Sequence, residues 1–125
     1  MSSSVTRFVG GSDVSRPWLL LADDAIVNLT GGTVTAEVWW LGSLQITLTV
    51  GAGLSISNMA PAVASPGDEQ PPHGYFLLTE VQTALVPLPD DDTLASVINS
   101  FWRIKFVSSE GVTMKSERFK LERIL

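Results

Sequence analysis

The fold class is decided by the stretch Val34-Thr-Ala-Glu-Val-Trp-Trp-Leu41, which Gly42-Ser43 joins to Leu44-Gln-Ile-Thr-Leu-Thr-Val50. Both halves alternate, and alternation rich in β-branched and aromatic residues is typical of β-strands. In the second half, the pattern predicts that Leu44, Ile46, Leu48 and Val50 point inward. A two-residue connection with glycine first favours a type II′ turn. We therefore predict a β-hairpin here.

Further short strands are predicted on both sides of this hairpin, at residues 7–9, 17–21, 54–57, 75–79 and 101–107, with returning strands at 112–115 and 117–121. The inward positions change parity between Met114 and Phe119, which predicts a bulge or bend near Ser116. About seven or eight short strands with frequent turn signals are typical of a β-sandwich or small barrel. We predict an all-β fold, either an antiparallel β-sandwich or a small barrel.

Two segments interrupt the strands. Thr79-Glu-Val-Gln82 fits a capping box and predicts one short helix through about Leu85, and a helical turn is expected near 93–97. The segment from Asn58 to His73 contains four prolines and no periodicity, so it is predicted to be a surface loop.

The chain has 125 residues, of which 45% are hydrophobic and 17% charged, and it has no cysteine. This length predicts a single domain over residues 1–125 with a core of its own. The composition argues against disorder, which needs low hydrophobicity and high charge. Without cysteine, disulfides, thiolate zinc sites and a cysteine nucleophile are excluded.

Charge is distributed unevenly along the chain. No Lys or Arg lies between Arg16 and Arg103, whereas six basic residues follow within the last 23 positions (125 − 102). An acidic body with a basic edge can steer partners or favour a homo-oligomer, and the alternative is a solvated face of the last hairpin. The formal net charge of −5 argues against a nucleic-acid partner.

The sequence shows no secretory signal, and its apolar run Trp18 to Ala22 ends at Asp23, far short of a membrane span. We therefore expect no membrane partner and folding in the cytoplasm.

The residues that could take part in catalysis or metal binding do not occur in the spacings that such sites require. His73 is the only histidine and has no Gly-x-Ser-x-Gly motif nearby, so we interpret it as an exposed loop residue. Asp90-Asp-Asp92 lacks the glycine and glutamate of a calcium-binding loop and is interpreted as a helix cap. Nothing in the sequence brings together any two of Asp68, Glu69 and Glu80 for glycoside hydrolysis. We predict no catalytic, cofactor-binding or metal site.

Trp39 and Trp40 must point to opposite faces of their strand, because side chains alternate. If Trp40 lies in the core with Val38, then Trp39 shares the other face with Glu37 and Leu41. An exposed Trp beside Leu suggests an interface or a ligand platform, and the alternative is a strand covered on both sides. Trp39 and Leu41 are the candidate interface residues.

Short turn signatures carry one family resemblance. Phe8-Val-Gly-Gly-Ser-Asp13, Trp18-Leu-Leu-Leu21, Leu29-Thr-Gly31 and Val34-Thr-Ala-Glu-Val38, with Gly74-Tyr-Phe-Leu-Leu-Thr79 later, resemble the N-terminal immunoglobulin-like domain of the phage baseplate upper protein family. Two segments depart from that pattern: Asp23-Asp24-Ala25-Ile26 replaces the usual Asp-Gly-x-Pro turn, and the loop from Asn58 is an insertion.

The resemblance implies an immunoglobulin-like antiparallel β-sandwich as the fold. It also implies that the protein is a structural, non-enzymatic component of a phage or prophage tail or baseplate. Its partners would be other tail proteins, and its location would be the virion after assembly in the bacterial cytoplasm. The alternative is a small carbohydrate- or ligand-binding β-sandwich module that uses Trp39 and the loop.

Overall fold

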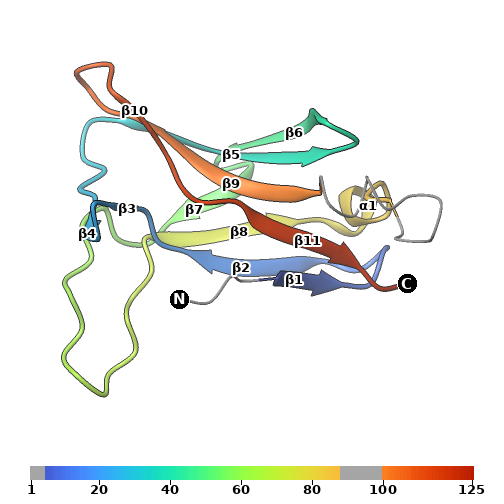
Figure 1. The fold of residues 1–125 in the computed structure, drawn as a ribbon, viewed down its shortest axis with the longest axis horizontal. Helices are drawn as coiled ribbons and strands as arrows, with labels where there is room; N and C mark the ends of the chain where they lie inside the picture. Colours follow the sequence, from blue (N-terminus) through green and yellow to red (C-terminus); the bar gives the residue numbers. More distant parts are fainter. Residues whose placement is uncertain (1–4, 88–99) are drawn as a thin grey trace.

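The computed structural model describes residues 5–87 and 100–125, and it confirms the all-β prediction (Figure 1). The elements in chain order are β1 (Val5–Phe8), β2 (Val14–Trp18), β3 (Leu21–Ala22), β4 (Ala25–Ile26), β5 (Thr33–Trp40), β6 (Ser43–Val50), β7 (Gly53–Ile56), β8 (Gly74–Leu78), α1 (Glu80–Thr83), β9 (Phe101–Val107), β10 (Thr113–Lys115) and β11 (Phe119–Arg123). Asp90-Asp-Asp92 and the helical turn expected near 93–97 lie outside the described residues.

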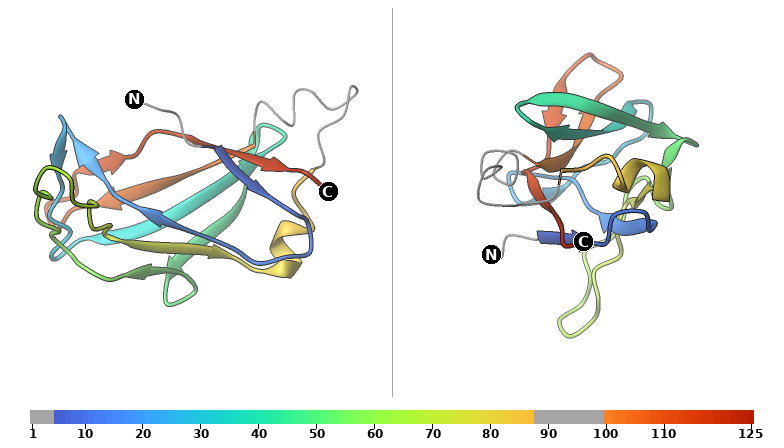
Figure 2. Two further views of the ribbon diagram at one scale, coloured as in Figure 1. Left: turned by 90° about the horizontal axis from the view of Figure 1, so that it is seen from below. Right: turned by 90° about the vertical axis from the view of Figure 1, so that its right-hand side faces the viewer.

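Most strands belong to one sheet, which follows the order β1-β11-β9-β5-β6-β7-β8-β2, with β10 also paired to β9. The sheet curls until its two ends, β1 and β2, approach each other, so that the molecule is nearly a closed barrel (Figure 2). The pairs β1–β11 and β6–β7 are parallel and the other described pairs are antiparallel. The small hairpin β3–β4 forms a second sheet at one end (Figure 1).

The predicted hairpin is present as β5 and β6, but its turn differs from the prediction. Trp40 pairs with Ser43, so the turn residues are Leu41 and Gly42, with φ values of 54° and 76°. Positive φ at both central positions defines a type I′ turn, whose twist matches that of the flanking strands. The prediction of a type II′ turn at Gly42-Ser43 was wrong by one residue.

The inward pattern predicted for β6 is correct only in part. Val38 pairs with Ile46, whereas its neighbour Trp39 pairs with Leu44, so Gln45 is an extra residue in a β-bulge. One extra residue reverses the alternation, and Leu44 therefore shares the outer face with Trp39. Leu48 is buried, but Leu44 and Val50 are exposed, which corrects the prediction for both.

The core lies inside the curled sheet. Val34, Ala36, Val38 and Trp40, which share one face of β5, are buried there beside the inward side chains of β9. Trp102 is the centre of an aromatic stack, with its ring 4.1 Å from that of Phe76 and 4.5 Å from that of Phe119. Its indole N–H donates to the hydroxyl of Thr6 at 3.1 Å, which joins β9 to β1.

The irregularity predicted near Ser116 is present. Lys115 pairs with Lys105 and Phe119 with Trp102, so three residues (116–118) face two (103–104). Ser116 fills the interruption, since its backbone N–H donates to the carbonyl of Ile104 and its hydroxyl accepts from the N–H of Ile104. The bulge lets one strand return along β9 as two pieces, β10 and β11.

The capping box predicted for α1 is also confirmed, with reciprocal bonds between Thr79 and Gln82. The Pro-rich loop projects from the end of the barrel opposite α1 (Figure 1). Gln70 holds this loop together, because its side-chain amide bonds the backbone of Ala62, Ala64 and Pro71.

Candidate functional site

The outer face of the sheet collects aromatic and basic side chains where β5, β9 and β11 lie side by side. Trp39 and Phe101 are direct cross-strand partners, and their rings stack with centres 5.7 Å apart and planes 9° apart. Lys120 is the partner of Phe101 on β11. We call the surface formed by Trp39, Phe101, Arg103, Arg118 and Lys120 the Trp39 surface.

A buried ion pair supports this surface from one side. Arg103 donates through Nε to Oε1 of Glu37 at 2.7 Å, and the two side chains are only 15% and 12% exposed. Burial raises the pKa of Glu37, but the hydrogen bond and charge of Arg103 outweigh it and lower the pKa below its ordinary value. The Arg103 guanidinium lies 5.6 Å from the ring centre of Trp39 and 5.8 Å from that of Phe101.

A second arginine covers Phe101 from the outside. The guanidinium of Arg118 lies 4.6 Å from the ring centre of Phe101, within cation–π distance. No carboxylate of the described residues forms an ion pair with Arg118. Arg118 and Phe101 line two adjoining hollows of about 210 Å³ and about 280 Å³, one extending to Trp39 and the other to Lys120. The surface therefore offers a positioned cation between two shallow depressions.

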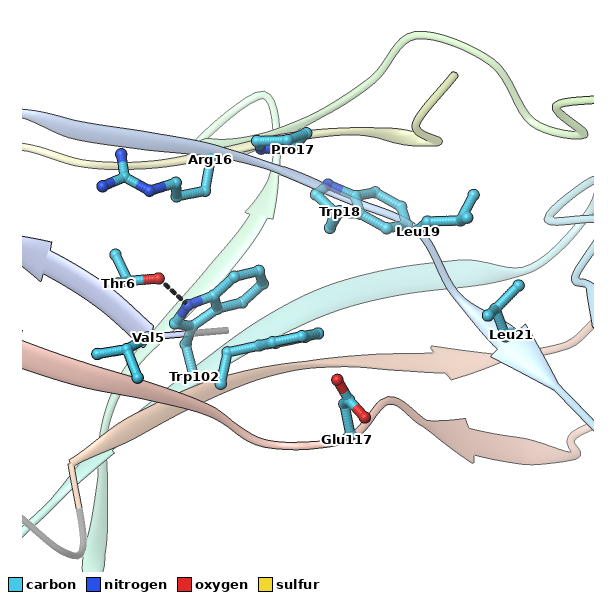
Figure 3. A pocket seen from close by; sticks show the side chains of 10 residues that line it. Val5, Thr6, Arg16, Pro17, Trp18, Leu19, Leu21, Trp102 and Glu117 are labelled. Carbon is cyan, nitrogen blue, oxygen red and sulfur yellow. Dashed lines mark hydrogen bonds between the residues drawn. The ribbon is translucent and has the colours of Figure 1, made fainter. Parts of the chain in front are cut away.

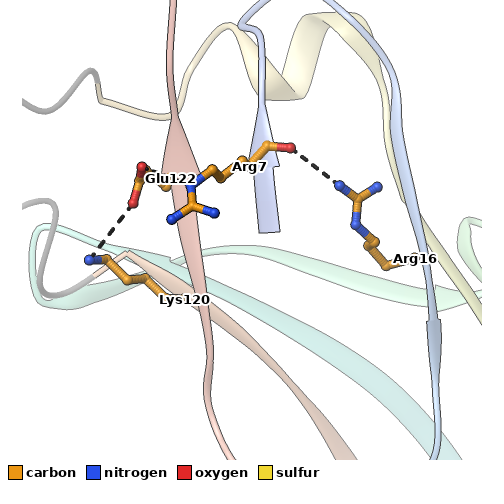
Figure 4. A network of polar contacts seen from close by, with 4 residues as sticks. All are labelled: Arg7, Arg16, Lys120 and Glu122. Carbon is orange, nitrogen blue, oxygen red and sulfur yellow. Dashed lines mark hydrogen bonds and ion pairs between the residues drawn. The ribbon is translucent and has the colours of Figure 1, made fainter. Parts of the chain in front are cut away.

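The neighbouring cations of β1 and β11 are engaged. Glu122 accepts from Nε of Arg7 at 3.2 Å and lies 3.9 Å from Nζ of Lys120 (Figure 4). Arg16 of β2 donates to the carbonyl of Arg7 at 3.3 Å, which links the two end strands of the sheet. Arg118 is thus distinguished from Arg7 and Lys120 by having no acidic partner in the described part of the chain.

The two predicted interface residues both lie at this end of the outer face. Trp39 is half-buried against Phe101, and Leu41 is 65% exposed in the turn beyond it. The indole N–H of Trp39 faces Glu37 and helps to lower its pKa, yet no acceptor among the described residues lies within hydrogen-bonding geometry of Nε1. Leu44, brought outward by the bulge, adds a 44% exposed apolar side chain beside Trp39.

Phe101 and Arg118 were not predicted as part of this site. The alternation of β9 places Phe101 on the outer face, but only the register of β5 with β9 and β11 shows that it meets Trp39 and Arg118. Sequence distance concealed the group, because Trp39 precedes Phe101 by 62 positions (101 − 39) and Arg118 by 79 (118 − 39).

The interpretation of His73 as an exposed residue was wrong, because its side chain is fully buried. Its Nδ1 accepts from the N–H of Leu20 at 3.0 Å, Nε2 donates to the carbonyl of Val27 at 2.7 Å, and its ring stacks on Trp18. Burial lowers the pKa of His73 despite the bond to Val27, so the ring is held neutral. The signal that was missed is its position directly before β8, where an imidazole ring can hydrogen-bond to the backbone of two neighbouring segments.

The carboxylates considered for hydrolysis are not brought together. Asp68 and Glu69 lie in the Pro-rich loop, whereas Glu80 begins α1 at the opposite end of the molecule (Figure 1). Within residues 5–87 and 100–125, no three of the His, Asp and Glu side chains are grouped as a metal site would require.

Comparison with protein-family models, with curated proteins and with solved structures finds no match to this chain. None of the helices in the described part of the chain has the length and apolar character needed to cross a membrane.

Proposed function

We propose that this chain is a structural, non-enzymatic assembly component of a phage or prophage tail or baseplate, and that it docks to another tail protein through the Trp39 surface. The observation that carries the docking proposal is Arg118, stacked on Phe101 between two hollows and without an acidic partner among the described residues. The phage assignment is supported only by the resemblance of the turn signatures.

The composition of the Trp39 surface favours a protein partner. Tryptophan and arginine are enriched among the residues that dominate binding energy at protein interfaces. Trp39 and Arg103 are held in place by Phe101 and Glu37, so little side-chain freedom remains to be lost on binding. Leu41 and Leu44 extend the surface with exposed apolar area.

Charge favours an acidic patch on that partner. A carboxylate that enters either hollow can pair with Arg118, and Lys120 borders one of the two hollows. Charge-assisted bonds to arginine are directional and strong when water is excluded. We therefore propose that the partner presents Asp or Glu side chains beside an apolar group that covers Trp39.

The test uses the proteins encoded beside this gene, each purified and measured by biolayer interferometry against the full chain. Binding to a tail or baseplate protein is expected, with a Kd raised about tenfold or more by Arg118→Glu. Lys115→Glu is the matched control, because it makes the same charge change on an exposed side chain of β10 outside both hollows. It is expected to change the Kd less than about threefold.

Two results would overturn the proposal. One is the finding that the neighbouring genes encode metabolic rather than tail proteins and that none of these proteins binds the chain. The other is specific binding on a glycan array that Trp39→Ala abolishes, which would support the ligand-binding alternative.

A further inference from the structure

The Pro-rich loop stands away from the barrel and has a defined shape (Figure 1). The Gln70 side chain bonds three backbone groups of the loop, and the N–H of Asp68 donates to the carbonyl of Ser65 at 2.9 Å. Pro66 followed by Gly67, whose φ is 90°, is the pattern of a type II turn. A segment that is already ordered loses little conformational freedom when it binds a partner.

The charge of the Pro-rich loop is entirely acidic. Asp68 and Glu69 are both exposed, and no Lys or Arg lies between Asn58 and His73. Within the described residues, neither carboxylate forms an ion pair. The loop therefore presents two adjacent negative charges to whatever it contacts.

The loop also presents an apolar side chain. Val63 is 80% exposed, which is the highest value among the exposed large hydrophobic residues of the described part of the chain. The Gln70 side chain bonds Ala62 and Ala64, the residues on either side of Val63. Val63 therefore lies close to Glu69, the neighbour of Gln70. An acidic group beside an apolar one is the combination that the Trp39 surface is expected to bind.

The hollow between β2 and β11 does not suit these carboxylates. It measures about 510 Å³, and both Arg16 and Glu117 line it (Figure 3). The guanidinium of Arg16 already donates to the carbonyls of Ser15 and Arg7. A carboxylate that entered this hollow would be repelled by Glu117, because like charges repel at close range.

The Trp39 surface offers the complementary groups. Arg118 lies between its two hollows and has no acidic partner among the described residues. Leu41 and Leu44 add exposed apolar area. β5 ends and β9 begins at the α1 end of the barrel, where Trp39 and Phe101 lie, whereas the Pro-rich loop projects from the opposite end (Figure 1). The loop of one molecule can therefore meet the Trp39 surface only of another.

We propose that the Trp39 surface binds the Pro-rich loop of a second copy of this chain. The inference rests on the docking surface proposed above and names a second copy as its occupant. In this contact the carboxylates of Asp68 and Glu69 pair with Arg118. Val63 covers the exposed part of Trp39. Because the contact joins unlike surfaces, each copy can give its loop to one neighbour and receive the loop of another.

The test is sedimentation equilibrium of the purified full chain between about 10 µM and about 1 mM. The average mass is expected to rise above that of one chain as the concentration increases. The rise should be smaller in about 500 mM than in about 50 mM NaCl, because salt screens exposed charges.

Variants on each side of the contact identify the surfaces. Arg118→Glu and Glu69→Arg are each expected to raise the Kd of self-association about fivefold or more. Glu110→Arg is the matched control for the loop, because it makes the same charge change in the exposed β9–β10 turn, and it should change the Kd less than about twofold. All three positions are exposed, so the variants are expected to fold.

A mixture of two variants tests whether the loop and the surface are partners. Arg118→Glu retains the original loop, and Glu69→Arg retains the original surface. Each variant alone should associate weakly, but their equimolar mixture should associate about as well as the wild type, because the loop of the first fits the surface of the second.

The inference is wrong if the chain stays monomeric up to about 1 mM, if either variant leaves self-association unchanged, or if the mixture associates no better than its components. A monomeric chain that still binds the product of a neighbouring gene through Arg118 would overturn this inference and leave the proposed function standing. Self-association through the loop, without such binding, would instead overturn the docking to another tail protein.

Discussion

Glu37 and Arg103 form an ion pair across directly opposed positions of β5 and β9, with 2.7 Å between Oε1 and Nε. Removing one member leaves the other charge nearly buried and unpaired, which costs more than the pair itself contributes. Glu37→Ala is expected to lower the free energy of unfolding by about 2–4 kcal/mol, measured by urea denaturation.

Two further variants check the cause. Glu37→Ala combined with Arg103→Met is expected to be more stable than Glu37→Ala alone, because no unpaired charge remains. Glu122→Ala breaks the more exposed pair with Arg7 and is expected to cost less than about 1 kcal/mol. Equal losses in Glu37→Ala and Glu122→Ala would contradict this account.

His73 predicts a pH dependence of stability. Its folded pKa lies below the ordinary value of 6.5, so below about pH 6.5 the unfolded chain binds a proton that the folded chain resists. The contribution of neutral His73 to the free energy of unfolding is therefore complete above about pH 6.5, and it declines as the pH falls toward the pKa of His73 in the folded chain. We expect a loss of about 1 kcal/mol between about pH 7.5 and about pH 5.5, measured by urea denaturation at each pH.

His73→Gln is expected to be less stable at neutral pH and to lack this dependence. Since His73 is the only histidine, NMR of its imidazole also reports the tautomer, which should carry its proton on Nε2. Retention of the full pH dependence in His73→Gln would assign the effect to other groups.

Leu41 adopts a left-handed conformation, with φ of 54°, which is uncommon for residues other than glycine and is taken more readily by Asn and Asp. Leu41→Asn creates the Asn-Gly pair preferred in type I′ turns and is expected to stabilise the chain by about 0.5–1 kcal/mol in thermal or urea denaturation. Ser43→Asn, which lies in β6 outside the turn, should bring no gain. A destabilised Leu41→Asn would show that the Leu41 side chain contributes contacts that outweigh the backbone preference.

The bond from Trp102 Nε1 to the hydroxyl of Thr6 joins β1 to the aromatic stack inside the barrel. Thr6→Val keeps the shape but leaves a buried indole N–H without an acceptor, and a loss of about 1–3 kcal/mol is expected in urea denaturation. Thr6→Ser keeps the hydroxyl and should lose less. Thr6→Val as stable as wild type would mean that the indole N–H finds another acceptor.

Several features were determined by the sequence through local rules. Alternation put Val34, Ala36, Val38 and Trp40 on one face of their strand, and this face is buried in the structure. The capping box at Thr79–Gln82 started α1 where expected. The parity change before Phe119 indicated the bulge at 116–118. These predictions succeeded because each depends on side-chain periodicity or bonds between residues a few positions apart.

Tertiary structure alone decided the features that depend on register and on burial by distant segments. One bulged residue, Gln45, reversed the face of Leu44, and the register of three strands brought Trp39, Phe101 and Arg118 together. His73 reads as a loop residue in the sequence, but the Leu20 and Val27 segments enclose it and bond both ring nitrogens. The physical reason is that burial and cross-strand contacts depend on which segments meet in space, whereas periodicity records only which side of its own strand each residue occupies.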